Sequence, residues 1–359
     1  MSSNSKSLHR FLIIFAVFLF ACHKQESVVD QPVQTQMIKA CDLSFLPEIR
    51  SANILTKNMN GQPEDMLVTL KNAGVNTIRL RLWNNPSDGH SGFEEVKSMS
   101  NEIHQRGMKV WLSVHYSDTW ADPGYQQKPG AWINASYNQL KDSVYAYTKK
   151  VVLEMNPDYI QIGNEINNGF LWPDGSYNNP DQMFGLLEQG IKAVRDCSGT
   201  SKIILHYAGY QNANPFFTKM NELDYDIIGL SYYPLWHGKN LDSLQAQLNI
   251  IGTQFNKDIL IAETSYPFTL GWNDWTNNII GDTSQILSEF PANPQGQKNY
   301  LQRIKAIITD TPKGLGFCYW GGEWIAFKGN QATNGSSYEN QALWDFNNQA
   351  VPAIQVFSD

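Results

Sequence analysis

Two glutamates each close a short apolar stretch of the chain: Glu165 ends residues 159–165, and Glu263 ends residues 259–263. Both stretches are rich in aliphatic and β-branched residues, which is typical of buried strands, and a carboxylate is costly there unless it faces a polar site. The two glutamates lie 263 − 165 = 98 residues apart, so only the fold can bring them together. Paired carboxylates of this kind cleave glycosidic bonds. We therefore expect Glu165 and Glu263 to face each other across a sugar-binding cleft.

The surroundings of the two glutamates predict different roles. Glu165 directly follows Asn164, whose side chain can bind a sugar hydroxyl near the bond to be cleaved, and we assign Glu165 as the acid/base, which needs a raised pKa. Glu263 should remain ionised, with Arg81 holding its charge and Tyr233 donating a hydrogen bond. Carboxylates about 5 Å apart, as in retaining enzymes, fit long side chains that reach inward from across a rim.

Eight strand-like runs alternate with amphipathic stretches along the chain. The runs are 38–41 with Leu43, 77–83, 109–116, 159–165, 202–207, 226–233, 259–263 and 314–320. The helical stretches between them include 63–73, 94–106, 137–155, 181–196, 241–255 and 297–308. Alternating strands and helices indicate a parallel α/β fold, and eight repeats predict a closed (β/α)8 TIM barrel. We expect a single catalytic domain over residues 38–359.

Alternate residues of each run share a face. One face is aliphatic and should pack on the helices, as we expect for Leu315, Phe317 and Tyr319 in the last run, whereas the other is small or polar and should face the barrel axis. The polar-face residues nearest the following loops are Arg81, His115, Glu165, His206, Tyr233, Glu263 and Trp320. Active sites of such barrels lie at the carboxyl ends of the strands. These seven side chains should therefore converge, with His115 and Trp320 shaping the subsite for the reacting sugar.

Long loops that mix tryptophan with polar residues follow several of these runs. The chain contains 11 tryptophans, and a tryptophan ring offers a flat face on which sugars stack. Asp118 and Trp120 lie in the loop after the third run, which leads on to Trp132, and Trp236 follows the sixth run. Residues 266–297 form a loop of a length that is usually functional. Together with His206, these residues are our candidates for contacts with a carbohydrate.

Several motifs resemble those of glycoside hydrolase family 53, the arabinogalactan endo-β-1,4-galactanases. The matching stretches are RLRLWNNP (79–86), HYSDTWADPG (115–124), QIGNE (161–165), SYYPLW (231–236), ETSYP (263–267) and PQGQ (294–297). The resemblance runs from about residue 38 to the C-terminus and implies a retaining barrel enzyme acting on the β-1,4-galactan of type I arabinogalactan. It makes Glu165 the acid/base and Glu263 the nucleophile. The stretch 320–324 departs from the family, which usually has Glu-Pro after the tryptophan.

Bacterial members of that family can hold a structural calcium ion in the loop after the seventh strand. Oxygen ligands of the right kind are present there in Asn273, Asp274, Asn277, Asn278 and Asp282. The same composition is ordinary for a solvated loop, so both interpretations stay open. No cofactor is expected for the chemistry itself.

The N-terminus has the pattern of an export signal. His9 and Arg10 precede the apolar run 11–21, which is too short to cross a membrane as a helix. The run stops at Cys22, as in a bacterial lipobox, in which this cysteine becomes the lipidated first residue of the mature chain. We therefore predict a lipoprotein signal peptide over 1–21, a flexible tether over 22–37 and an outer-membrane lipoprotein on the cell surface or the periplasmic face. A plain secretory signal is the alternative.

Composition restricts the remaining possibilities. A net charge of −7 argues against a nucleic-acid partner, and the odd number of cysteines after Cys22 does not support a disulfide framework. We expect a monomer. Three alternatives stay open: a clan-related β-mannanase or β-glucanase, a transglycosylase, and a non-catalytic surface glycan-binding lipoprotein. The presence of both Glu165 and Glu263 argues against the non-catalytic glycan-binding protein, which would need neither.

Overall fold

The computed structural model describes residue 1 and residues 36–358. All but the first residue of the predicted signal peptide, the lipidation site Cys22 and nearly all of the predicted tether lie outside the described residues. No helix in the described part of the chain is long and apolar enough to cross a membrane.

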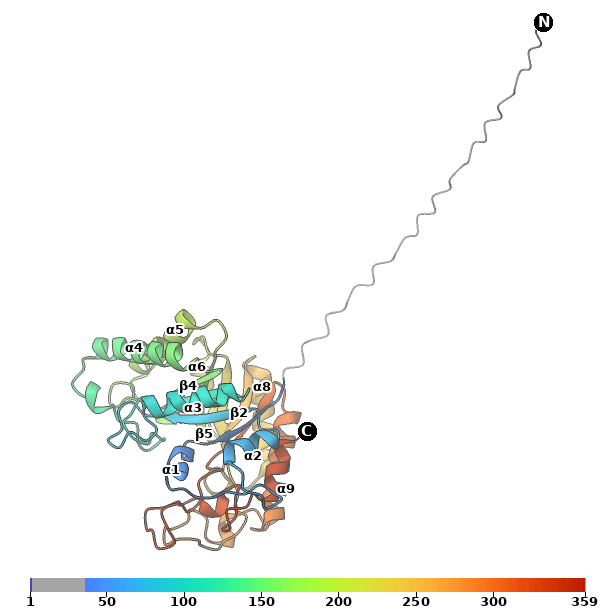
Figure 1. The fold of residues 1–359 in the computed structure, drawn as a ribbon. Coiled ribbons are helices and arrows are strands. Elements are labelled where there is room, and N and C mark those ends of the chain that lie inside the picture. Colours follow the sequence, from blue (N-terminus) through green and yellow to red (C-terminus); the bar gives the residue numbers. More distant parts are fainter. Residues whose placement is uncertain (2–35, 359) are drawn as a thin grey trace. The chain divides into compact units, whose positions relative to one another are not determined.

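Eight parallel strands form a closed barrel in chain order, with β1 paired to β8 (Figure 1). The strands are β1 (Ile38–Asp42), β2 (Thr77–Leu82), β3 (Lys109–Val114), β4 (Tyr159–Ile162), β5 (Lys202–Ala208), β6 (Ile227–Ser231), β7 (Asp258–Thr264) and β8 (Gly314–Tyr319). The predicted (β/α)8 TIM barrel is confirmed. The first strand begins at Ile38.

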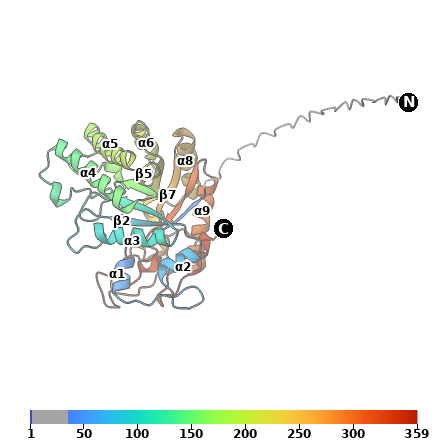
Figure 2. The same ribbon diagram turned by 45° about the horizontal axis from the view of Figure 1, so that its top comes forward.

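Helices surround the strands, as Figure 2 shows. They are α1 (Leu46–Ser51), α2 (Met66–Asn72), α3 (Phe93–Gln105), α4 (Tyr137–Met155), α5 (Pro180–Cys197), α6 (Ala213–Met220), α7 (Pro234–His237), α8 (Leu241–Gln254) and α9 (Pro294–Asp310). Short 3₁₀ turns add η1 (Gly130–Trp132), η2 (Ile166–Asn168), η3 (Thr283–Gln285), η4 (Glu339–Gln341) and η5 (Pro352–Phe357). Capping residues in the sequence explain where some of these helices begin. Ser136 and Gln139 form a capping box before α4, and Asn293 caps the N-terminus of α9.

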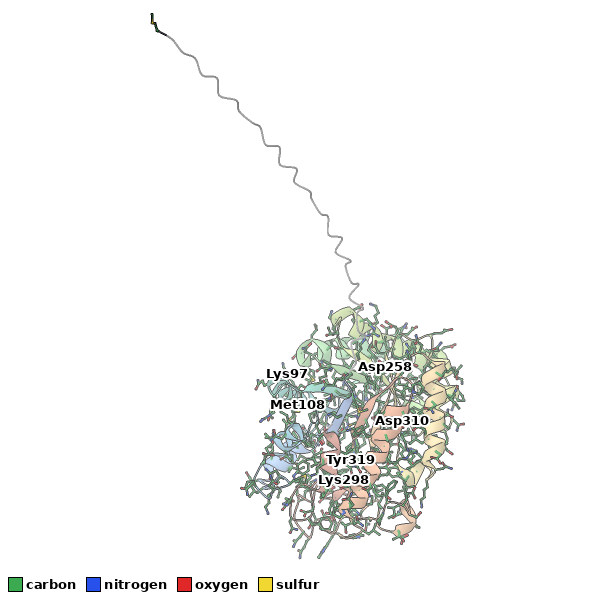
Figure 3. All side chains as sticks on the ribbon, turned by 90° about the vertical axis from the view of Figure 1, so that its right-hand side faces the viewer. Lys97, Met108, Asp258, Lys298, Asp310 and Tyr319 are labelled. Atoms are coloured by element: carbon green, nitrogen blue, oxygen red, sulfur yellow. The ribbon has the colours of Figure 1, made fainter. Side chains whose placement is uncertain are left out.

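Buried side chains form two layers. The larger one fills the space between the strands and the helices, and the smaller one fills the barrel interior. Figure 3 draws the side chains on the ribbon and labels Tyr319, which belongs to the larger layer. The interior layer comprises Ile38, Ala40, Trp111, Tyr159, Ile204, Ile227, Leu260, Ala262, Leu315 and Cys318. The outer layer includes Phe317 and Tyr319, as alternation predicts. The predicted outward position of Leu315 is wrong, because the pairing of β7 with β8 shifts register and Gly316 adopts a φ of +155°.

A second irregularity in β7 aims the catalytic candidate Glu263. Ile259 and Ile261 belong to the outer layer, whereas Leu260 and Ala262 belong to the interior layer. Strict alternation would therefore turn the next side chain outward. The pairing with β6 instead skips a residue, because Leu230 pairs with Ile261 and Ser231 pairs with Glu263. This β-bulge turns Glu263 toward the barrel mouth, as bulges next to active sites often do.

Candidate active site

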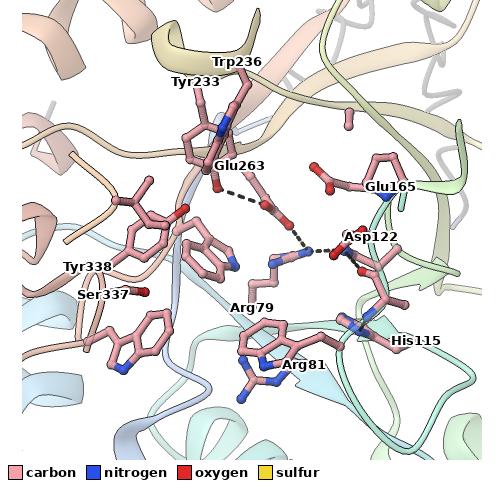
Figure 4. Close-up of a pocket in the computed structure, with 18 of the residues that line it drawn as sticks. Arg79, Arg81, His115, Asp122, Glu165, Tyr233, Trp236, Glu263, Ser337 and Tyr338 are labelled. Atoms are coloured by element: carbon pink, nitrogen blue, oxygen red, sulfur yellow. Dashed lines mark hydrogen bonds and ion pairs between the residues drawn. The ribbon is translucent and has the colours of Figure 1, made fainter. Parts of the chain in front are cut away.

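A cavity of about 690 Å³ opens at the carboxyl ends of the strands (Figure 4). Both glutamates line it, and so do seven of the ten residues predicted to contact substrate. These seven are Arg81, His115, Trp120, Asn164, Tyr233, Trp236 and Trp320. The predicted convergence of polar and aromatic side chains at this end of the barrel is therefore observed. The cavity is lined mainly by aromatic rings and a few charged groups, as expected for a ligand site.

Glu165 and Glu263 face each other across this cavity (Figure 4). One oxygen of each carboxylate lies within 4.8 Å of the other and of a ring nitrogen of His206. This separation falls in the range of enzymes that form a covalent intermediate, and it is too short for a water molecule between the carboxylates as inverting enzymes require.

Glu263 is held by two donors. Arg79 Nη2 lies 2.7 Å from its Oε1, and the Tyr233 hydroxyl donates to its Oε2 at 2.9 Å. The predicted contact with Tyr233 is confirmed, but the predicted contact with Arg81 is wrong. Arg79 takes that place because it lies two residues earlier on the same face of β2, deeper in the barrel, where it also pairs with Asp42 at 2.9 Å.

Arg81 is instead enclosed by aromatic rings. Its guanidinium carbon lies 4.0 Å from the ring centre of Trp120 and 4.6 Å from those of Phe45 and Trp83. Its nitrogens contact Ser91 and His90. Burial lowers the pKa of the Arg81 guanidinium to about 10, which still leaves it charged at neutral pH. Arg81 therefore holds the aromatic wall of the cavity together through cation–π contacts.

Local backbone geometry brings Glu165 into the cavity. β4 ends at Ile162, and Gly163 and Glu165 then adopt left-handed conformations with φ of +78° and +46°. This conformation is rare for a residue other than glycine and is often stabilised by its surroundings at functional sites. Ser231 donates a hydrogen bond of 2.5 Å to Glu165 Oε1. The preceding residue, Asn164, accepts from Arg79 at 3.0 Å and donates to the carbonyl of Ala121 at 2.8 Å.

The two carboxylates differ in their electrostatic surroundings. Burial, followed by the nearby charge of Glu263, raises the pKa of Glu165 to about 8. Burial also raises the pKa of Glu263, but the Arg79 guanidinium and the Tyr233 hydroxyl act in the opposite direction. The proton shared by this pair therefore resides on Glu165, and Glu263 carries the negative charge beside Arg79. This is the division of charge expected of an acid and a nucleophile.

Three predicted contact residues do not line the cavity. Asp118 accepts hydrogen bonds from the backbone of Asn85 at 2.9 Å and of Gly130 at 2.8 Å, so it shapes the loop after β3. Trp132 packs against Tyr116 and Tyr147. His206 is fully buried behind Glu165. The sequence pointed to these residues by type and proximity, and neither reveals which way a side chain turns.

Other residues of the cavity were missed by the sequence interpretation. Arg79 shared the polar face with Arg81 and could have been chosen by depth along the strand. Asp122 lies within the motif at 115–124. Trp324 and Tyr338 come from the loop after β8 and stack on each other with ring centres 5.6 Å apart. No pattern in the sequence marks that contact.

The predicted calcium ligands do not assemble as a set. Asp282 caps η3 by accepting from the Ser284 backbone, and Asn277 is exposed, so both are corrections. Asn273 contributes its backbone amide to Glu339 at 2.6 Å. Asp274, by contrast, is buried, and its Oδ2 has no hydrogen-bond partner among the described residues. Buried Asn278 Oδ1 and Glu339 Oε2 likewise have none among those residues.

These unpartnered oxygens are of the chemical kind that could hold a cation. The charge of Asp274, after burial, raises the pKa of Glu339, so two carboxylates lie near each other without a basic partner in the described part of the chain. Carboxylate and amide oxygens suit a hard cation such as Ca²⁺. Glu339 lies after β8 and was not among the predicted ligands.

A closed (β/α)8 barrel with two opposed glutamates at the ends of β4 and β7 defines a glycoside hydrolase that retains anomeric configuration. The family model described as Glycosyl hydrolase family 53 matches residues 38–357. The chain therefore belongs to glycosyl hydrolase family 53, as its motifs suggested.

Individual relatives agree with this assignment. A protein of Bacillus subtilis (strain 168) named endo-beta-1,4-galactanase is 32% identical, over 89% of this chain and 85% of the relative. An arabinogalactan endo-beta-1,4-galactanase of Cellvibrio japonicus is 31% identical, over 90% and 91%. The GH53 catalytic domain of Ignisphaera aggregans superimposes with a TM-score of 0.86 at 37% identity, covering 91% of this chain and 97% of that one. A GH113 β-1,4-mannanase at 14% identity shares the fold alone.

The raised pKa of Glu165 predicts a pH-dependent cost to stability. The pKa of Glu165 is about 8 in the folded state, which is above the pKa of a glutamate in the unfolded chain. The contribution of protonated Glu165 to the free energy of unfolding is therefore complete at low pH and is lost as the pH rises toward 8. Glu165→Gln removes this loss. We expect its free energy of unfolding, relative to the wild type, to increase by about 4 kcal/mol between pH 5 and pH 9, from about three pKa units at about 1.36 kcal/mol each.

Denaturant unfolding at both pH values measures this difference. Glu222→Gln, at an exposed position, controls for the substitution itself. If the free energy of unfolding of Glu165→Gln differs from that of the wild type by the same amount at both pH values, the assigned protonation is contradicted.

Proposed function

We propose that the chain hydrolyses internal β-1,4-galactosidic bonds of galactan and type I arabinogalactan. The observation that carries this proposal is the pair of carboxylates within 4.8 Å, of which one pairs with Arg79 and the other has a raised pKa. The substrate follows from the relatives, which are named endo-beta-1,4-galactanases. An intact acid and nucleophile favour this enzyme over a non-catalytic glycan-binding protein.

The reaction proceeds in two displacements. Glu263 attacks the anomeric carbon, the glycosidic carbon–oxygen bond breaks, and Glu165 gives its proton to the departing sugar oxygen. Glu165, now a carboxylate, then removes a proton from a water molecule, which attacks the same carbon and releases Glu263. Arg79 keeps Glu263 ionised for the first step, and Tyr233 supports it by hydrogen bonding. Neither step needs a cofactor.

The cavity walls provide contacts for the sugar chain. Trp320 and Trp120 lie with ring centres 6.1 Å apart, next to Trp324, and offer flat faces for sugar rings. Trp236 is 53% exposed at the opposite rim and can stack on a further residue of the chain. His115 lines the cavity, and its Nδ1 accepts from the Ala121 backbone, so its Nε2 remains for a sugar hydroxyl. These assignments are part of the proposal.

Substrate choice and the nucleophile are tested together. The purified chain is incubated separately with linear β-1,4-galactan, β-mannan and β-glucan, and the products are resolved over time. We expect galactan alone to be cut and oligosaccharides of intermediate length to appear early. Glu263→Ala should lower kcat at least about 10³-fold, because no nucleophile remains.

Glu222→Ala, at an exposed position, is the control and should keep wild-type activity. Galactobiose as the sole early product would contradict internal cleavage. Binding of galactan without any cleavage would replace the enzyme by the glycan-binding alternative. Longer products formed by transfer to sugar would identify a transglycosylase. Full activity in Glu263→Ala would overturn the assignment of the nucleophile.

We further propose a structural calcium ion held by Asp274, Asn278 and Glu339, which would tie the loop after β7 to the loop after β8. The support is their unpartnered buried oxygens. Removal of calcium with a chelator should lower the melting temperature of the wild type, and calcium should restore it. Glu339→Gln should abolish this response, whereas Asp282→Asn should preserve it. A response lost in Asp282→Asn and kept in Glu339→Gln would contradict this ligand set.

The N-terminal prediction also stands as a proposal. Residues 1–21 would be removed on export, residues 22–37 would tether the catalytic domain over 38–359, and lipidated Cys22 would anchor the chain to the outer membrane. Its support is the apolar run 11–21 followed directly by a cysteine. Mass spectrometry of the mature chain should find an acylated Cys22 as the first residue. An unmodified N-terminus at another position would indicate a plain secretory signal.

A further inference from the structure

A chain of buried hydrogen bonds reaches Glu165 from the side away from the cavity. Ser231, at the end of β6, donates to Glu165 Oε1 at 2.5 Å, and His206 Nε2 on β5 lies 2.8 Å from the Ser231 hydroxyl. Both residues are fully buried, and neither lines the cavity. Their polar groups therefore serve Glu165 rather than the sugar.

The direction of these bonds follows from the surroundings of His206. Its Nδ1 receives the backbone N–H of Glu165 at 3.4 Å and faces the side-chain amide of Gln161 at 2.9 Å. Nδ1 also lies 3.2 Å from Asn164 Oδ1, but that oxygen already accepts from Arg79 and from Ser113, so we assign Nδ1 as an acceptor. Burial, then the charge of Arg79, lowers the pKa of His206 well below its usual range, and the neutral ring carries its proton on Nε2. Nε2 thus donates to Ser231, whose own proton points to Glu165. Glu165 is the remaining acceptor for it among the described residues.

We propose that Ser231, oriented by His206, is a positioning residue that reserves Oε1 of Glu165 as an acceptor and leaves Oε2 to carry the catalytic proton. This inference rests on the proposed acid/base role of Glu165. In the first displacement the Oε2–H bond breaks as the proton passes to the leaving sugar oxygen. In the second, Oε2 takes a proton from the attacking water. The protons of Ser231 and His206 stay in place throughout.

The hydrogen bond from Ser231 also adjusts the acidity of Glu165. The charged groups that act on Glu165 are Glu263 on β7, Arg79 on β2 and Asp122 in the loop after β3. Glu263 and Asp122 oppose ionisation, whereas Arg79 and the Ser231 hydroxyl favour it. Loss of the hydroxyl should therefore raise the pKa of Glu165, and the alkaline limb of the pH–rate profile should move to higher pH.

Ser231→Ala tests the inference with two substrates. One is linear β-1,4-galactan, whose leaving group needs a proton, and the other is 2,4-dinitrophenyl β-1,4-galactobioside, whose leaving group does not. With galactan we expect kcat/KM to fall about 10-fold or more and its alkaline limb to shift upward. With the dinitrophenyl substrate kcat/KM should stay within about two-fold of the wild type, because kcat/KM reports the first displacement and this leaving group departs without a proton from Oε2.

Matched variants separate positioning from folding. Ser231→Thr keeps the hydroxyl and should restore the wild-type limb, and His206→Phe should shift the limb in the same direction as Ser231→Ala. Ser100→Ala removes a buried hydroxyl that bonds the Val96 carbonyl in α3, and it should change neither substrate's kinetics. An equal loss with both substrates, or an unshifted alkaline limb in Ser231→Ala, would overturn the inference.

Glu165→Ala distinguishes this failure from failure of the proposed function. If Glu165→Ala loses activity on galactan but keeps kcat/KM on the dinitrophenyl substrate, the acid/base role stands, and the result for Ser231→Ala decides the positioning role alone. If the wild type cuts neither substrate, the proposed function fails and the inference fails with it.

Discussion

The Arg79 guanidinium joins two buried carboxylates, Asp42 on β1 and Glu263 on β7, and it also reaches Asn164 after β4. A buried charge without its partner is strongly destabilising, so this one side chain couples three parts of the barrel mouth. Burial alone would lower the pKa of Arg79, but the charges of Glu263 and Asp42 outweigh it and raise that pKa. The same contacts that stabilise the rim therefore supply an ionised nucleophile.

Glu165 differs from Glu263 in protonation because the two side chains have different neighbours. No arginine or lysine forms an ion pair with Glu165 in the described part of the chain, where its carboxylate accepts from the neutral Ser231 hydroxyl, whereas Arg79 pairs directly with Glu263. Two like charges within 4.8 Å cannot both be held cheaply, so ionisation of Glu263 favours the proton on Glu165. The two roles therefore follow from one asymmetry of the pair. Arg79 forms an ion pair with Glu263, which is ionised and acts as the nucleophile, and Glu165 keeps the proton and acts as the acid.

Alternation along the strands predicted most of the barrel from sequence, because a parallel sheet with two packed faces leaves little choice of side-chain direction. It failed at Leu315, where Gly316 and a register shift intervene, and the aim of Glu263 also depends on a bulge at Ala262 that no sequence pattern announces. Arg79 and Arg81 share a face, and depth along the strand, which periodicity does not report, decides which one meets Glu263. Contacts between loops, such as those of Glu339, depend on tertiary packing alone.

The central claim is that burial, together with the charge of Glu263, keeps Glu165 protonated. Carbon-13 NMR titration of the chain labelled at the glutamate side-chain carboxyl carbons measures this directly, with Glu165→Gln used to assign the signal. The account predicts that Glu165 titrates near 8 in the wild type and at lower pH in Glu263→Gln, where the neighbouring charge is gone. A Glu165 signal that titrates in the ordinary glutamate range, or one that Glu263→Gln leaves unchanged, would contradict it.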